Sequence, residues 1–582
     1  MHFASPYHLF FMQKGWLILW LLLSVAACPA QSVGLPSWDN RAQTAWWTQQ
    51  AEPPTWPQAV KDLTAQLEAA YRQNGANVFS NADFQGWLAH LQWIQLGLDN
   101  PQLIAEPEAL KAFIAVGKDD AISHLFVEKL DPRDVRAEAL KNILLLAQAN
   151  PADLHDYAAL GVAFSLVFDQ PFPTNWPHHQ VKQEAVPIGD LDIVPRFQFY
   201  LQANKDRKTA LDLTQVSFEN LKFLVDSEVK LSELEYALAD KLPYSHFDDA
   251  FFVINYDTSR IGGGNFAFEW SQPTYTLDDI KNIGGICVDQ AYYATILGKG
   301  RGIPTLYFHG QGSSGGHAWF GYMTRSGRWN LDCGRYASQN YPKGYALDPQ
   351  TWQPIDDTRL TNFFKNGEKN ANYLPAQTAL AWAKLHGYEP VTLKILEQAR
   401  KIMPELSETW EMEAVWLQKT HASADDQKAF YRDWINQFTT FADMKIEGQR
   451  RLLAVMKETK DPGAQDLERS LVIQNRGRGF DEGIQASAAP IFDKIKEGDW
   501  DAARLQYERA IRDFGEQGGG TLFYAIIVPY VEACLKADQV KQADRAIHFT
   551  EERMPLDPEG VIGSEFAKLK GEVSDLVKKL PK

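Results

Sequence analysis

Cysteine is scarce in this chain: four in 582 residues, namely Cys28, Cys287, Cys333 and Cys534. A scaffold held together by disulfides needs more pairs than these can form, so that class of protein is disfavoured. Lys and Arg number 58 against 74 Asp and Glu, and no long basic run breaks the net charge of −16. This shortage of positive charge argues against nucleic acid as a partner.

Long apolar runs are also lacking near the N-terminus. The run at 16–23 is too short for a comfortable membrane span. It follows Lys14 and precedes the small residues 24–27, an arrangement typical of a cleaved export signal. We expect residues 1–28 to be a signal peptide, with Met12 as a second candidate for the start.

The end of this signal leaves two alternatives open. Residues 25–28, Val-Ala-Ala-Cys, resemble a bacterial lipobox, which implies that Cys28 becomes the lipidated first residue of the mature protein. The other alternative is ordinary cleavage near Ala27 or Ala30. The first predicts a periplasmic or outer-membrane-associated lipoprotein held to the membrane through the Cys28 lipid, and the second predicts a secreted protein.

The region from 36 to 242 is predicted to be mainly helical. Apolar residues recur at helical spacing in 56–74, in 130–149 and again in 211–242, and 158–168 is apolar enough for a buried helix. A proline-rich loop, 170–187, interrupts this pattern.

Two adjacent histidines, His178 and His179, lie in that proline-rich loop. No Cys or carboxylate stands near them at the spacing of metal ligands. They are therefore interpreted as part of a surface loop, and no metal site is expected.

Residues 243–350 mix short strand-like segments with a helical one, and this pattern predicts a mixed α and β core. A helix is expected over 287–298, and a turn at Ser326-Gly327 joins two strands. The predicted strands are 251–254, 305–308, 317–323 and 329–332.

Residues 373–582 are predicted to be helical throughout. The segment 496–503, Lys-Glu-Gly-Asp-Trp-Asp-Ala-Ala, resembles part of a tetratricopeptide helix pair, and 538–546 echoes it. The spacing is irregular, so an unrelated helical bundle stays open as the alternative. The resemblance implies that the region binds a protein partner along a concave face.

Cys287 is the candidate nucleophile. It follows Gly284 and Gly285 and opens a predicted helix. Backbone N–H groups and the helix dipole at that end favour a thiolate. The two glycines are expected to leave room for the backbone of a substrate.

His317 and Asp332 are the candidate partners of this cysteine. They lie 15 residues apart on either side of the turn, which places them on adjacent antiparallel strands. A neutral imidazole at His317 could take the proton of the Cys287 thiol. A carboxylate at Asp332 could orient that imidazole.

Four motifs in order resemble the transglutaminase-like superfamily. They are the cysteine segment 284–291, Gly-Ile-Pro at 302–304, His-Ala-Trp at 317–319 and Trp-Asn-Leu-Asp at 329–332. The resemblance covers about 244–346 and implies an α+β fold. In this fold a papain-like transglutaminase core is flanked by a mainly helical N-terminal region and a helical, repeat-like C-terminal region. It also implies a catalytic triad of Cys287, His317 and Asp332 that needs no cofactor.

The expected reaction is thioester-mediated acyl transfer or hydrolysis on protein or peptide amides. The backbone N–H of Cys287 is one expected oxyanion donor. Trp270, Gln272 and Tyr275 stay open as side-chain donors. Two other functions also stay open: a cysteine protease or amidase without transferase activity, and a non-catalytic scaffold that binds a protein and keeps a vestigial core.

Overall fold

The fold of the chain is α+β, mostly helical with one small antiparallel sheet, as predicted at that level. The computed structural model describes residues 34–50, 53–174, 176–261, 268–312, 315–336, 343–366, 370–473, 480–558 and 560–580. The predicted signal peptide, with Met12 and Cys28, lies outside the described residues. None of the described helices has the length and apolar character needed to cross a bilayer.

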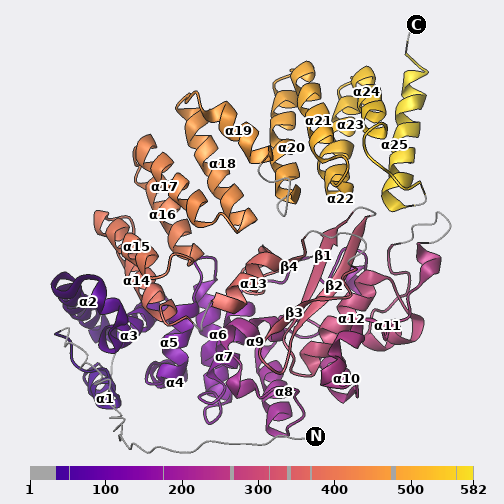
Figure 1. The fold of residues 1–582 in the computed structure, drawn as a ribbon. Helices are drawn as coiled ribbons and strands as arrows, with labels where there is room; N and C mark the ends of the chain where they lie inside the picture. The colour runs from indigo at the N-terminus through magenta and orange to yellow at the C-terminus, as the bar shows by residue number, and fades with distance from the viewer. Residues whose placement is uncertain are drawn as a thin grey trace, which may run out of the picture.

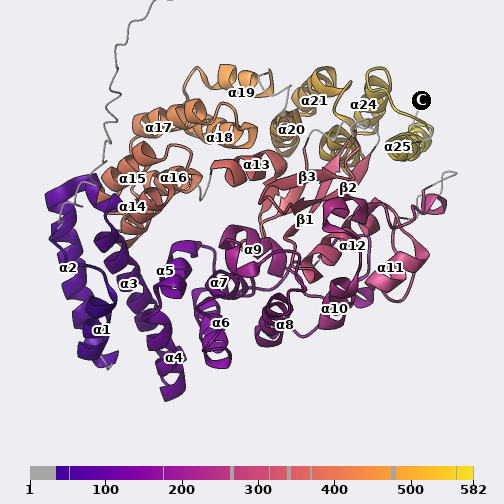
Figure 2. The same cartoon turned by 60° about the horizontal axis from the view of Figure 1, so that its bottom comes forward.

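The N-terminal region is a curved row of helices (Figure 2). The helix predicted over 56–74 is confirmed, and the apolar segment 158–168 forms a buried helix as expected. The stretch 211–242 contains two α-helices, and between them Val229 forms an isolated bridge with Ile188. The helices are α1 Asn40–Gln49, α2 Trp56–Asn74, α3 Ala82–Asp99, α4 Pro107–Gly117, α5 Asp120–Lys129, α6 Arg136–Ala149, α7 Ala158–Val167, α8 Ile193–Lys205, α9 Phe218–Val225 and α10 Leu231–Ala239.

A five-stranded antiparallel sheet lies at the centre of the mixed region, in the order β3-β2-β1-β4-β5. Three predicted strands and the helix at 287–298 are confirmed, and the short strands β4 and β5 were not predicted. The strand expected at 251–254 is wrong, since 244–251 forms a 3₁₀ helix followed by a turn. The elements are α11 Leu277–Ile283, α12 Cys287–Gly300, β1 Thr305–Gln311, β2 Gly316–Met323, β3 Trp329–Cys333, β4 Tyr345–Leu347 and β5 Pro354–Asp356.

The C-terminal region forms a second curved row of helices that passes over the sheet (Figure 1). Ala503 and Ala510 are buried between neighbouring helices, where small side chains allow close approach. A short helix begins at Gly519. The helices are α13 Asp357–Asn366, α14 Tyr373–Leu385, α15 Pro390–Ile402, α16 Ser407–Lys419, α17 Ala424–Gln437, α18 Ala442–Glu458, α19 Ala464–Ile473, α20 Phe480–Lys496, α21 Trp500–Phe514, α22 Gly519–Leu522, α23 Val528–Lys536, α24 Val540–Glu551 and α25 Val561–Val577.

The C-terminal row is attached to the rest of the molecule at both ends. At its start, Trp382 of α14 is buried against Phe84 of α3 in a shared apolar cluster. Near its other end, the N–H of Gly520 donates to the carbonyl oxygen of Gly312 beside the β1–β2 hairpin, at 3.1 Å. The row therefore bridges from the N-terminal helices to the β1–β2 hairpin (Figures 1 and 2).

Candidate active site

Cys287 is half-buried at the first turn of α12, which packs against β1 and β2. Gly284 has a φ of +89°, and a Cβ at this position would lie 2.6 Å from the carbonyl oxygen of Asn255. The N–H of Gly285 donates to that same oxygen at 2.9 Å. A Cβ at Gly285 would lie 2.4 Å from the side chain of Asp289. Gly284 therefore makes room for the backbone of Asn255 and Gly285 for Asp289, while the expected room for a substrate backbone stays a prediction.

Asp289 is fully buried and fixes the start of α12. Its carboxylate accepts the backbone N–H of Ile286 at 2.8 Å, the hydroxyl of Tyr275 at 2.8 Å and Nη1 of Arg260 at 2.7 Å. A buried carboxylate needs such partners, because desolvation would otherwise favour its protonated form. The residue directly before the nucleophile is thus held by a charged hydrogen-bond network.

The same network continues to His178. The N–H of Gln180 donates to Nδ1 of His178 at 3.2 Å, so the proton of the neutral ring is on Nε2. Nε2 then donates to the hydroxyl of Tyr275 at 2.8 Å, and that hydroxyl donates to Asp289. Burial lowers the pKa of His178 to about 3, which keeps the ring neutral.

His178 is therefore a buried residue with a defined role, and its assignment to a surface loop was wrong. Its neighbour His179 is exposed. The sequence offered no periodic signal for this difference, because the loop is irregular and Tyr275 lies almost a hundred positions away. Only the tertiary contact distinguishes the two rings.

The thiol of Cys287 is protonated at rest. Burial raises its pKa to about 11, and the charge of Asp289 also raises it. The backbone N–H groups of Ala318, Val288 and Cys287 itself point to the sulfur and lower the pKa, but by less. The helix N-terminus acts in the expected direction, yet the loss of solvent outweighs it.

His317 on β2 lies beside Ala318 and is 6% exposed. Its Nε2 lies 2.7 Å from the carbonyl oxygen of Gly334, an acceptor, so Nε2 carries the proton and Nδ1 is the basic nitrogen. Burial lowers the pKa of His317, and Tyr336 stacks on the ring with centroids 4.7 Å apart. The imidazole is held in a neutral form that can accept a proton.

Asp332 lies outside this pair. On β3 it stands between the buried residues Leu331 and Cys333, so its side chain faces the solvent and is 67% exposed. Its carboxylate pairs with Nη1 of Arg335 at 2.9 Å. The Gly334 carbonyl accepts the hydrogen bond through which Asp332 was expected to orient His317. The role of Asp332 stays a prediction, and the structure does not place its carboxylate beside the imidazole.

The three proposed oxyanion side chains point elsewhere. Tyr275 donates to Asp289, and Nε1 of Trp270 donates to the carbonyl oxygen of Thr274 at 2.9 Å. Gln272 is exposed on the surface. None of the three is among the described residues that line the cavity at Cys287, which leaves the backbone N–H of Cys287 as the expected donor.

Cys287 and His317 open into one cavity of about 770 Å³. His178 lines it from the N-terminal region and Tyr307 from the mixed core. Tyr524, Val561 and Glu565, from the C-terminal row, also line it. A volume of this size admits a peptide-sized or drug-sized ligand. The structure thus brings together the predicted nucleophile and base, and it adds a wall that the motifs did not reveal.

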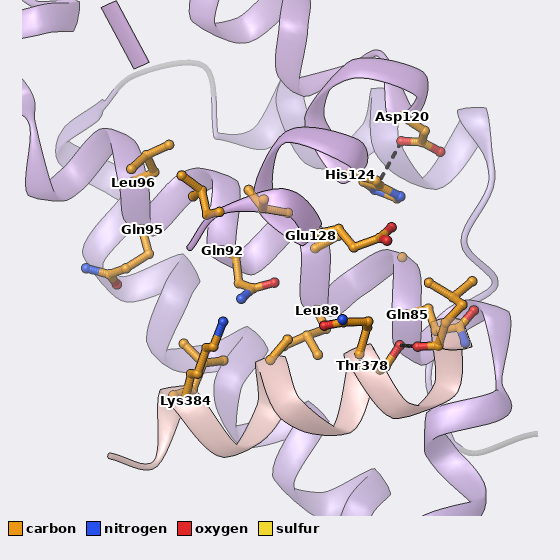
Figure 3. Close-up of a pocket in the computed structure, with 18 of the residues that line it drawn as sticks. Gln85, Leu88, Gln92, Gln95, Leu96, Asp120, His124, Glu128, Thr378 and Lys384 are labelled. Atoms are coloured by element: carbon orange, nitrogen blue, oxygen red, sulfur yellow. Dashed lines mark hydrogen bonds and ion pairs between the residues drawn. The ribbon is translucent and has the colours of Figure 1, made fainter. Parts of the chain in front are cut away.

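A second cavity, of about 370 Å³, lies between α3, α5 and α14 (Figure 3). Lys384 reaches into it from α14, while Glu128 and His124 face it from α5. Among its described lining residues there is no cysteine and none of the predicted catalytic residues. Cysteine chemistry is therefore supported at the first cavity and not at this one.

Within the described part of the chain, no three or more His, Cys, Asp or Glu side chains are grouped so as to hold a metal ion. Cys287, Cys333 and Cys534 are free thiols. Comparison of the chain with protein-family models, with curated proteins and with solved structures finds no match in any of the three.

Proposed function

We propose that the protein is an exported cysteine enzyme that forms a thioester between Cys287 and the acyl group of a protein or peptide amide. The observation that carries this proposal is that Cys287 and His317, both in neutral form, line one ligand-sized cavity. A helix-borne cysteine packed on antiparallel strands in motif order also supports a papain-like, transglutaminase-like core.

The first step follows from the protonation states. As Sγ of Cys287 attacks the amide carbon, its proton moves to Nδ1 of His317, and the Gly334 carbonyl stabilises the imidazolium through Nε2–H. A sulfur–carbon bond forms and the carbon–nitrogen bond breaks. The imidazolium then gives its proton to the leaving amine.

The second step decides between the alternatives. His317 takes a proton from water or from a primary amine, which attacks the thioester and releases Cys287 as a thiol. Water gives an amidase or protease, and an amine gives a transferase. If neither step occurs, the remaining alternative is a scaffold whose C-terminal helices bind a protein partner.

An activated ester tests the nucleophile without knowledge of the natural substrate. Purified protein mixed with p-nitrophenyl acetate should release a burst of p-nitrophenolate equal to the protein concentration. Intact mass and peptide mapping should place one acetyl group on Cys287. His317→Ala should slow this acylation by about a hundredfold or more, the usual contribution of a general base.

The matched control is His309→Ala, because His309 lines the same cavity and its pKa is also lowered by burial. It should acylate at a rate within about threefold of the unmodified protein. Acetylation that survives in Cys287→Ser, or that is equal in both histidine variants, would contradict the proposal. Adding a primary amine during turnover, with products identified by mass spectrometry, separates transfer from hydrolysis.

A further inference from the structure

The C-terminal row forms part of the wall around the nucleophile, although it is far from Cys287 in the sequence. Tyr524 lies in the short π-helical turn after α22, and Val561 and Glu565 lie on α25. All three line the cavity that contains Cys287. A Cβ at Gly315, beside the β1–β2 hairpin, would lie 3.7 Å from the side chain of Val561, so the two regions are in close contact there.

The described side chains that line this cavity provide a negative charge and no fixed positive charge. Glu565 is the only Asp or Glu among its described lining residues, and those residues include no Lys or Arg. His178, His179, His309 and His317 also line it, and burial lowers the pKa of His178, His309 and His317. The cavity therefore presents one carboxylate and no fixed positive charge.

Glu565 is held in place without being neutralised. Its Oε2 accepts the hydroxyl of Tyr524 at 2.9 Å, and it takes part in no ion pair among the described residues. A half-buried carboxylate with one neutral hydrogen-bond partner gains from a cation that approaches it. The hydrogen bond fixes its direction without using its charge.

Aromatic rings surround the rest of the cavity. Such rings attract cations over their faces, most strongly where water is excluded. The combination of one carboxylate with several aromatic faces recognises an ammonium or guanidinium group. The aromatic lining residues are Trp176, Tyr256, Phe268, Tyr307, Trp352 and Tyr524.

We infer that the wall made by Tyr524 and Glu565 is a subsite for a cationic group of the substrate, next to the amide that Cys287 attacks. This inference rests on the proposed function for its substrate class, but the subsite itself can be measured separately. The C-terminal row then selects which acyl donor reaches the thiol. A neutral or acidic peptide of equal size would bind less well.

Charged thiol reagents of similar size test the subsite directly. The rate of modification of Cys287 is measured with trimethylammonioethyl and with sulfonatoethyl methanethiosulfonate, with the uncharged methyl reagent as reference. A carboxylate in the same cavity as the sulfur should favour the cationic over the anionic reagent by about threefold to tenfold at low salt. Cys287→Ser gives the background from Cys333 and Cys534.

Glu565→Gln should bring this ratio close to one and leave the rate of the methyl reagent unchanged, which also shows that the variant is folded. Glu572→Gln is the matched control, since Glu572 is exposed on the same helix α25 and is not among the described residues that line the cavity, so this variant should keep the preference for the cation. An unmodified protein without a cationic preference, or the same ratio in Glu565→Gln, would overturn the inference. Failure of the acylation test with a normal charge ratio would instead remove the proposed reaction and leave the subsite.

Discussion

Among the histidines that line the cavity, His178 and His317 come from different regions, and their rings are held by different hydrogen-bond partners. His178, in the segment before α8, belongs to a buried chain of side chains that runs through Tyr275 to Asp289 and Arg260. His317, on β2, is held by the backbone carbonyl of Gly334. The carboxylate that matters most to the site is therefore coupled to the histidine that no motif pointed to.

The difference indicates that the network around His178 supports the structure of the site, whereas His317 is placed to take part in the reaction. The network around His178 ends at the residue before Cys287, where Asp289 accepts the N–H of Ile286. This network fixes the position of the Cys287 thiol. His317 lies beside Ala318, whose N–H points to the sulfur of Cys287. Nδ1 of His317 is its basic nitrogen. We expect variants of the first set to lower stability and variants of the second to lower reactivity.

The largest expected effect is on stability, in Asp289→Ala. The change leaves Arg260, the hydroxyl of Tyr275 and the N–H of Ile286 without their common acceptor in a buried site. Breaking a buried ion pair from one side costs about 3–5 kcal/mol of unfolding free energy. Urea unfolding followed by circular dichroism measures this loss.

Asp332→Ala is the control for that experiment, because Asp332 also pairs with an arginine but is 67% exposed. Its cost should stay below about 1 kcal/mol, as for other exposed ion pairs. Equal losses in the two variants would show that the network around Asp289 does not support the site.

The next effect is the pH dependence of thiol alkylation. With a thiol pKa of about 11, the reactive thiolate fraction of Cys287 rises tenfold for each pH unit below that value. The rate with iodoacetamide should therefore increase about a hundredfold between pH 7 and pH 9 and show no plateau in this range. Stopped-time alkylation with peptide mapping gives the rate at Cys287.

A plateau near neutral pH would indicate a thiolate–imidazolium pair, and it would contradict a resting state in which Cys287 and His317 are both neutral. Glutathione measured under the same conditions is the control, because its rate levels off near the ordinary thiol pKa. The lowered pKa of His317 predicts that no proton release from this ring is seen between pH 7 and pH 9.

Gly334→Ala should have a moderate effect on reactivity. Gly334 has a φ of +86°, and a Cβ there would lie 2.8 Å from the ring of Phe251, so the backbone must shift. The carbonyl that orients His317 shifts with it, and we expect acylation of Cys287 to fall about tenfold. The burst assay with p-nitrophenyl acetate measures this change.

Gly387→Ala separates backbone strain from the loss of orientation. Gly387 has a φ of +57° at the end of α14, and nothing lies within 4 Å of a Cβ at this position. It should lower stability by about 1 kcal/mol and leave acylation unchanged. A similar loss of acylation in both variants would mean that general destabilisation, and not the Gly334 carbonyl, is responsible.

The sequence predicted those parts of the site that depend on local pattern. Strand alternation and a Gly turn placed His317 and β3 in one hairpin, and a helix start placed Cys287. It could not predict Asp289 as the main buried carboxylate, because its partners come from three separate segments. It also could not show that the C-terminal row reaches the cavity, since that contact depends on the curvature of the whole row.

The smallest expected effect is that of Asp332→Asn on reactivity, and it bears most directly on the comparison. If the Gly334 carbonyl orients His317, the exposed carboxylate of Asp332 is dispensable, and acylation should change by less than about threefold. A carboxylate that orients a catalytic imidazole contributes far more, up to about 10⁴-fold when it is replaced by its amide. The two cases therefore differ by several orders of magnitude in the same burst assay. A large loss in Asp332→Asn would mean that the hairpin rearranges to bring the carboxylate to His317 during the reaction, so that His317, like His178, depends on an aspartate.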